Sequence, residues 1–390
     1  MDFWAFGALS AILPEGLFHI GETALLKNTA QYQSAALAWG LGFYQFSTYK
    51  TETQPRLAKL IIPKTVDFAS LEKYLSAIEL SRNLINTPAE DMGPEALENA
   101  ALTVAKKMGA TTTVIKGDKL LKENYPAIHA VGRASVREPR VIDLRWGKNK
   151  KAPKITLVGK GVCFDSGGLD LKNAAGILLM KKDMAGAAMM LSLAQLIISH
   201  DLPVQLRLLI GAVENAVSGN SYRPGDIIKT RSGKTVEITN TDAEGRMVLC
   251  DLLFEACQAK PDIIIDFATL TGAARVALGE DIPALYAQPQ SFADDLLQAS
   301  QKVNDPLWQM PLVSQYKEKL KSEMADMINA VDSPYGGSIT AALFLQAFVN
   351  PDIKWAHVDT PAWNFKPKPG RPVGADAFGV RAMFEYIRDL

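Results

Sequence analysis

The chain has 390 residues, with 42 basic and 42 acidic side chains, four histidines and three cysteines. A chain of this length is expected to form two or three domains with a large buried core, and its balanced charge argues against a dedicated nucleic-acid-binding protein. The histidines form no HExxH motif and the cysteines no CxxC pair, which argues against the common zinc sites and iron–sulfur clusters, so any metal must be bound mainly by carboxylates.

The sequence shows no sign of a membrane span or an export signal. No apolar run approaches the roughly 20 residues that a membrane-spanning helix needs. Residues 1–20 carry Asp2 and Glu15 but no basic region and no clear cleavage site. The small, odd number of cysteines is typical of a reducing compartment. We therefore expect a cytoplasmic protein.

Two domains of unequal size are expected. The first covers residues 1–66, where short apolar pieces are broken by residues such as Pro14, and it is interpreted as a small, shortened α/β domain. The second covers residues 67–390 and begins with a linker helix over 67–85, in which apolar residues recur at helical spacing. Pro88 follows this helix and disfavours its continuation.

In the larger domain, short apolar strands alternate with helices. This pattern favours an α/β fold with a central, mostly parallel sheet that is flanked by helices. Strands are predicted at 111–115, 155–162, 204–213, 236–239, 263–268 and 355–358, and helices at 94–108, 184–199, 245–257 and 338–348.

Two segments that follow predicted strands combine acidic residues with small ones. Ligands bind outside the carboxyl ends of the strands in open α/β sheets, so we expect both segments to face one cleft. Four carboxylates packed closely cannot all stay ionised without compensation, and two divalent cations would balance them. Two-metal sites are common in hydrolases. The alternative is that these residues are only helix caps and surface turns. The four carboxylates are Asp165, Asp183, Asp242 and Glu244.

Both segments resemble the motifs of the leucyl aminopeptidase (cytosol aminopeptidase) family of two-metal exopeptidases. The string Asn-Thr-Asp-Ala-Glu-Gly-Arg at 240–246 is similar to the family's hallmark, and the spacing from Lys160 through the first motif to the second agrees as well. The resemblance extends from about Asn86 to the C-terminus and implies that 67–390 is the catalytic domain. Further matches lie at 213–215, 223–226, 269–272 and 335–337.

The resemblance implies two divalent metal ions per subunit, zinc or manganese, with magnesium or cobalt possible at the more exchangeable site. Asp165 and Glu244 would contact both ions. Lys160 and Asp183 would complete the tighter site, and Asp242 the exchangeable one. A lysine can bind a metal only as the neutral amine, so this role requires a lowered pKa of Lys160.

The resemblance also implies the catalytic and substrate-binding residues. Lys172 would stabilise the oxyanion of the intermediate, and Arg246 would hold a bicarbonate ion as the general base. The implied activity is release of N-terminal residues, preferentially leucine-like ones, from short peptides by metal-activated water, in a homohexamer. The implied substrate-binding residues are Met180, Asn240, Thr269, Leu270 and Gly272.

Two other functions remain open from the sequence. Some relatives with this fold bind DNA, although the balanced charge makes nucleic acid an unexpected partner here. A serine or cysteine amidase would use Ser166 or Cys163 and resist chelators, but Cys163 has no evident histidine partner and is interpreted as core filler. The segment 360–364 departs from the family pattern, which leaves the side-chain preference open.

Overall fold

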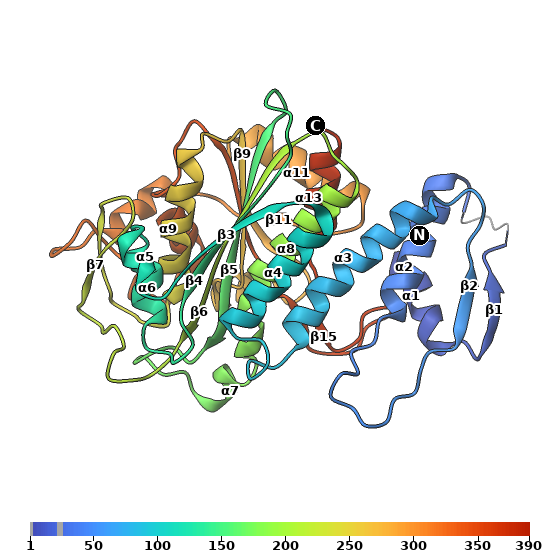
Figure 1. Cartoon of the computed structure of the whole chain (residues 1–390), viewed down its shortest axis with the longest axis horizontal. Coiled ribbons are helices and arrows are strands. Elements are labelled where there is room, and N and C mark those ends of the chain that lie inside the picture. Colours follow the sequence, from blue (N-terminus) through green and yellow to red (C-terminus); the bar gives the residue numbers. More distant parts are fainter. Residues whose placement is uncertain (1–2, 22–25) are drawn as a thin grey trace.

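The computed structural model describes residues 3–21 and 26–390. The N-terminal elements lie at one end of the molecule and are joined to the larger part by the helix α3 (Phe68–Asn86) (Figure 1). They are α1 (Phe3–Ile12), β1 (Gly16–His19), α2 (Thr29–Phe43) and β2 (Ala58–Ile61), and the two strands pair in parallel. This arrangement confirms the expected small α/β domain. Helices α1 and α2 cross closely at Gly42, where a Cβ atom would lie 2.1 Å from the carbonyl oxygen of Gly7.

The larger part is built on an eight-stranded mixed sheet with the strand order β11-β10-β13-β9-β5-β6-β4-β3. Its central strands β13, β9, β5 and β6 run parallel, whereas β4 pairs antiparallel with both of its neighbours and β10 pairs antiparallel with β13. The strands are β3 (Thr111–Lys116), β4 (Arg140–Trp146), β5 (Lys154–Asp165), β6 (Gln205–Asn215), β9 (Ile263–Ala268), β10 (Ala284–Gln288), β11 (Trp308–Gln309) and β13 (Lys354–Asp359).

Helices cover both faces of this sheet and bury its apolar strands (Figure 1). Their side chains form two hydrophobic clusters, one on each face, and the parallel strands between them are buried almost throughout. One face is packed by α3, α4 (Pro94–Met108), α8 (Ala185–Ser199), α11 (Gln290–Lys302) and α13 (Val380–Arg388). The other face is packed by α6 (Pro126–Gly132), α9 (Glu244–Gln258) and α12 (Gly337–Gln346).

The remaining elements are short, and several of them surround the carboxyl ends of the parallel strands. The strand predicted at 236–239 is observed as β8 (Thr235–Glu237), but it belongs to a separate three-stranded sheet with β7 (Ile227–Lys229) and β12 (Met327–Ile328). The others are α5 (Lys119–Lys122), α7 (Ala174–Ile177), the 3₁₀ helices η1 (Met180–Met184) and η2 (Ser314–Leu320), α10 (Gly272–Leu278), β14 (Trp363–Asn364) and β15 (Gly374–Ala375). Among residues 3–21 and 26–390, no helix combines the length and apolar character needed to cross a membrane.

Candidate active site

A pocket of about 560 Å³ lies at the carboxyl ends of β5, β9 and β13. It collects side chains from loops far apart in the sequence, as expected for an α/β sheet. Every site residue inferred from the sequence lines it. These are Lys160, Asp165, Lys172, Met180, Asp183, Asn240, Asp242, Glu244, Arg246, Thr269, Leu270 and Gly272.

Asp165 is the last residue of β5, and its orientation is fixed by the neighbouring strand. The Nδ2 group of Asn215, at the end of β6, donates a hydrogen bond of 2.8 Å to Asp165 Oδ1. The same oxygen accepts a bond of 2.9 Å from the backbone N–H of Gly167. The other oxygen, Oδ2, lies 2.8 Å from the ammonium of Lys172. One oxygen of Asp165 is therefore occupied by neutral donors, and the second is available to a cation.

The two motif loops are joined directly to each other. The backbone N–H of Thr241 donates to Asp170 Oδ2 at 2.7 Å, and the N–H of Asp170 donates to Thr241 Oγ1 at 2.9 Å. These reciprocal bonds hold the loop after β5 against the loop that precedes α9. The carboxylates of both loops thereby converge, and oxygens of Asp165, Asp242 and Glu244 lie within 4.8 Å of one another.

Lys160 lies at the centre of the site and is almost fully buried. Its Nζ is 2.6 Å from Asp183 Oδ2 and 2.8 Å from Glu244 Oε1, and it donates to the carbonyl oxygen of Thr269 at 3.2 Å. Gly245 makes room for this side chain, because a Cβ atom there would lie 2.5 Å from Lys160 Cε. The glycine of the second motif thus has a packing role.

The charges of the site shift several pKa values. Burial alone would lower the pKa of Lys160, but the charges of Asp183 and Glu244 raise it above its usual value. Burial and the neighbouring Asp165 raise the pKa of Glu244, and the same two causes raise the pKa of Asp242 to about 6. The lowered pKa expected for Lys160 is therefore not produced by the protein groups, and its amine becomes a ligand only if a cation displaces the proton.

The residues present fit divalent cations. Three buried carboxylate oxygens, Asp183 Oδ2, Asp242 Oδ1 and Glu244 Oε1, have no partner with hydrogen-bond geometry and are compensated only by ion pairs with Lys160 and Lys172. Carboxylate oxygens suit Mg²⁺ and Mn²⁺ as well as Zn²⁺. A cation bound among these oxygens would also relieve the mutual repulsion that raises their pKa values.

Arg246 is buried beside the carboxylates and has one free donor. Its Nη1 donates to the carbonyl oxygen of Asn329 at 2.6 Å, whereas its buried Nε has no hydrogen-bond partner. Burial lowers the pKa of this guanidinium to about 10, so it remains a cation at neutral pH. The group is suited to bind a small anion in the pocket.

The loop after β9 is held by a residue that the sequence did not suggest. Asp359, at the end of β13, accepts hydrogen bonds from the backbone N–H groups of Leu270 (2.8 Å) and Thr271 (3.2 Å) and from Thr271 Oγ1 (2.7 Å). Thr269 Oγ1 in turn donates to Asp183 Oδ1 at 2.6 Å. Asp359 therefore positions the loop that bears three of the proposed substrate-binding residues. In the sequence, its position directly after the strand predicted at 355–358 was the feature that could have indicated this role.

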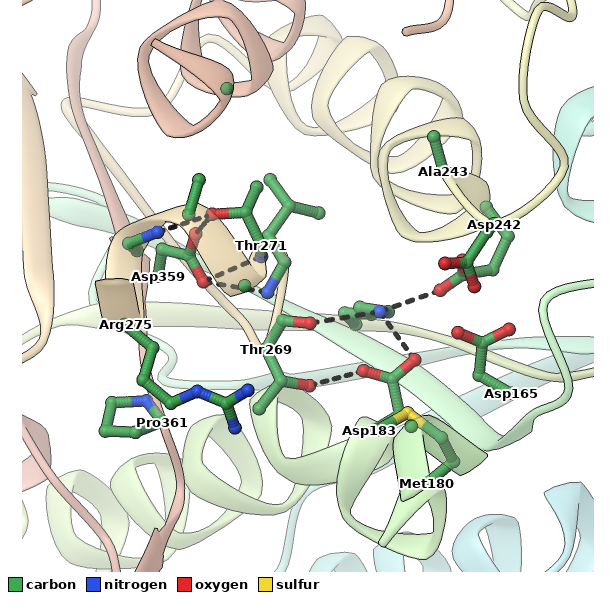
Figure 2. Close-up of a pocket in the computed structure, with 18 of the residues that line it drawn as sticks. Asp165, Met180, Asp183, Asp242, Ala243, Thr269, Thr271, Arg275, Asp359 and Pro361 are labelled. Carbon is green, nitrogen blue, oxygen red and sulfur yellow. Dashed lines mark hydrogen bonds and ion pairs between the residues drawn. The ribbon is translucent and has the colours of Figure 1, made fainter. Parts of the chain in front are cut away.

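The far side of the pocket contains residues that the sequence analysis missed. Figure 2 shows Arg275 and Pro361 across the pocket from Asp165 and Asp242. Burial lowers the pKa of Lys182, which also lines this pocket, to about 8. Within the segment 360–364, Thr360 and Pro361 line the pocket, whereas Trp363 packs under Lys181, with Nζ 5.4 Å from the ring centre.

The geometry of Ser166 and Cys163 argues against an amidase that uses either as a nucleophile. Ser166 Oγ donates to the carbonyl oxygen of Asn215 at 2.7 Å and accepts from the N–H of Gly168 at 3.1 Å. Cys163 is fully buried, and burial raises the pKa of its thiol. Neither side chain has a histidine partner among the described residues, so neither has a base to activate it.

Two models of one protein family match most of this chain. The catalytic-domain model of the cytosol aminopeptidase family matches residues 79–384, and the N-terminal-domain model of M17 aminopeptidases matches residues 1–63. A probable cytosol aminopeptidase of Rhodopirellula baltica is 45% identical over 82% of this chain and 63% of its own length. One of Roseiflexus castenholzii is 41% identical over 94% of this chain and 78% of its own length.

Solved structures give the same result. The crystal structure of the cytosol aminopeptidase from Coxiella burnetii has a TM-score of 0.96 and 53% identity, covering 100% of this chain and 84% of that one. The bottromycin maturation enzyme BotP in complex with Mn has a TM-score of 0.92 and 32% identity, covering 100% and 88%. The chain therefore belongs to the M17 cytosol aminopeptidase family of metal-dependent hydrolases, with its N-terminal and catalytic domains.

Proposed function

We propose that this protein removes N-terminal residues, preferentially leucine-like ones, from short peptides, using two divalent metal ions held by Lys160, Asp165, Asp183, Asp242 and Glu244. The observation that carries the proposal is the convergence of four carboxylates on two lysines in one pocket. The metal-free groups already repel each other, which favours a cation there. Zinc and manganese are the expected metals, with magnesium or cobalt possible at the exchangeable site that includes Asp242.

Bound metal ions would supply Lewis acidity and water activation. The protein's own groups provide the rest of the chemistry. Asn215 and Gly167 orient Asp165 through its Oδ1. Lys172 pairs with Asp165 and Asp242 in the pocket, which supports its proposed role: its positive charge would stabilise the negative charge that develops on the scissile carbonyl oxygen.

Arg246 is proposed to hold the general base, a bicarbonate ion. Its free Nε and its buried positive charge support this role, because a small anion would satisfy both. No histidine belongs to either motif, so the proposed base is borrowed from solution. Arg246 would orient this base, while the carboxylates of the site would bind cations and would not act as the base.

The part of the pocket near Met180 is proposed to receive the first substrate side chain. Met180, Leu270 and Ile282 give it apolar walls, and a methionine adapts to side chains of different shape. Asn240, Thr269 and Gly272 line the same pocket and are proposed to contact the substrate backbone. A cytoplasmic homohexamer is the proposed working form.

The decisive experiment measures metal content and hydrolysis of a leucine anilide before and after chelation. We expect chelation to abolish activity and Mn²⁺ to restore it. Asp165→Ala and Glu244→Ala should each abolish activity while cooperative thermal unfolding is retained, and Asp294→Ala on the exposed face of α11 serves as the control. Hydrolysis that survives complete metal removal, or full activity in either site variant, would contradict the proposal.

A further inference from the structure

Two cations in the pocket are not used by the proposed reaction. Lys182 follows Met180 by two residues in η1, is only 8% exposed and lines the pocket, yet its amine makes no hydrogen bond or ion pair with any residue in the described part of the chain. Arg275 lines the same pocket from α10, with its guanidinium directed into it (Figure 2). Its side-chain contact is a cation–π interaction with Phe365, at 5.5 Å from the ring centre.

The carboxylates closest to these cations are already occupied. Asp183 is shared between Lys160 and the hydroxyl of Thr269. Asp359 accepts two backbone N–H groups and the hydroxyl of Thr271. On the opposite side of the pocket, Lys172 compensates Asp165 and Asp242. Within residues 3–21 and 26–390, the lysines of the metal cluster are therefore paired with carboxylates, whereas Lys182 and Arg275 form no ion pair.

Lys182 is the buried member of this pair, whereas Arg275 is exposed. A buried cation without a partner is costly, and an anionic ligand group can offset this cost. The positions of both residues connect them to the first substrate side chain. Lys182 belongs to the same short helix as Met180, and Arg275 lies three residues after Gly272, on the same face of α10. Because glycine has no side chain, the surface beside Arg275 stays open to the pocket.

We propose that Lys182 and Arg275 bind the carboxylate of an acidic N-terminal residue, so that this pocket accepts glutamate and aspartate in addition to leucine-like side chains. The inference rests on the proposed aminopeptidase function and specifies its substrates. Arginine offers a planar pair of donors for a carboxylate, and lysine adds a third donor. Glutamine has almost the same shape as glutamate but no charge, which makes it the matched comparison.

The experiment compares kcat/KM for glutamate, glutamine and leucine anilides on the manganese-loaded enzyme at neutral pH. We expect the glutamate anilide to exceed the glutamine anilide by roughly tenfold, the effect of one charge-assisted hydrogen bond. Arg275→Gln and Lys182→Met should each reduce this glutamate-to-glutamine ratio towards one. Arg145→Gln, at an exposed arginine on the β4 strand, should leave the ratio unchanged.

A second readout measures binding without turnover. Calorimetry with free glutamate and free glutamine should show the same preference, and Arg275→Gln should remove it. A ratio of one or below in the unaltered enzyme would overturn the inference while leaving the aminopeptidase function intact, provided the leucine anilide is cleaved. Failure to cleave any of the three anilides would overturn both.

The main competing occupant is the C-terminal carboxylate of a short peptide. It is tested by comparing Leu-Gly with Leu-Gly amide. If Arg275→Gln lowers the rate for the free acid alone and leaves the glutamate-to-glutamine ratio unchanged, the cations serve the peptide terminus and the proposal is wrong. If the variant changes the anilide ratio and treats the two dipeptides alike, the first side chain is the ligand.

Discussion

Asn215 holds Asp165 in place across two parallel strands, through a hydrogen bond of 2.8 Å from its Nδ2 group to Asp165 Oδ1. Both residues are buried, and the same Nδ2 group donates to the carbonyl oxygen of Thr241 at 3.1 Å. One amide therefore connects the last residue of β5 with the loop that carries Asp242. Residues that orient metal ligands in this way usually affect metal affinity strongly.

We predict that Asn215→Ala lowers the affinity for Mn²⁺ by about 10–100-fold, the usual effect of losing such a support. The physical reason is that Asp165 loses its fixed orientation and Asp242 loses its link to β6. Titration of the metal-free protein with Mn²⁺ measures the effect. Asn149→Ala, in an exposed turn, is the control and should bind as before. Unchanged affinity in the Asn215 variant would show that Gly167 alone orients Asp165.

A second prediction concerns Lys160 in the metal-free protein. Lys160→Ala leaves Asp183 and Glu244 buried and facing each other without a cation. We expect the free energy of unfolding of the chelated protein to fall by about 3–5 kcal/mol, as for other broken buried ion pairs. Excess Mn²⁺ should recover part of the loss, because a bound cation replaces the missing ammonium.

The matched control for this prediction is Lys321→Ala. Lys321 pairs with Glu318 at 2.5 Å, but both side chains are about 70% exposed. Exposed pairs of this kind contribute only about 0–1 kcal/mol. Chemical denaturation of both variants in the presence of chelator gives the comparison. Equal losses in the two variants would mean that Lys160 does not compensate the carboxylates.

A third prediction concerns pH and lies outside the site. Burial raises the pKa of Asp251 to about 7, although the N–H groups of Arg231, Ile128 and Ala127 donate to it. The unfolded chain loses this proton near the ordinary value of 3.8. Between these two pH values the folded protein binds the extra proton, so its stability falls as pH rises, by up to about 1.4 kcal/mol per pH unit.

The Asp251→Asn variant cannot ionise and should lack this component. We expect the difference in unfolding free energy, wild type minus variant, to decrease as pH rises from 5 to 7 and to level off above that. A constant offset from altered hydrogen bonds does not affect the slope. A flat difference would mean that the folded pKa of Asp251 is ordinary.

The proposed metal ligands could be selected from the sequence because two acidic motifs follow predicted strands, and all five of these residues line one pocket. Their role as ligands stays a prediction. It did not predict the role of Asp359. That role depends on β9 and β13 being neighbours, although Leu270 and Asp359 are 89 residues apart. The strand β4 was missed because Asp143 and Arg145 interrupt its apolar pattern. In the folded protein, Asp143 Oδ2 pairs with Arg207 Nη2 of β6 at 2.8 Å, a contact that local sequence does not indicate.

Sequence alone also could not separate Lys182 from Lys181. The two lysines are adjacent in η1, yet one lines the pocket and the other donates to the carbonyl oxygen of Asn86 at 2.6 Å. Their directions depend on how η1 packs between α3 and β5. Domain limits near residue 66 remain a prediction, because α3 contacts both the N-terminal elements and the helix α8.

The last prediction tests how the N-terminal part is attached to the rest. Arg82 of α3 is buried and pairs with Asp376 through Nη2 at 2.8 Å, while its Nη1 donates to the carbonyl oxygen of Leu41 in α2 at 2.8 Å. One guanidinium therefore links α2, α3 and the segment before α13. Arg82→Ala should cost about 3–5 kcal/mol of unfolding free energy, since Asp376 would be left buried without its partner.

Arg223→Ala is the control, because Arg223 is 69% exposed and its pair with Asp226 is at the surface. The double variant Arg82→Met/Asp376→Leu separates the cost of an unpaired charge from the value of the pair. If the double variant is markedly more stable than Arg82→Ala, the single variant lost unfolding free energy because the Asp376 carboxylate was left buried without a partner. If both are equally unstable, the bond from Arg82 to Leu41 is the important one, and the guanidinium acts mainly as a clamp on α2.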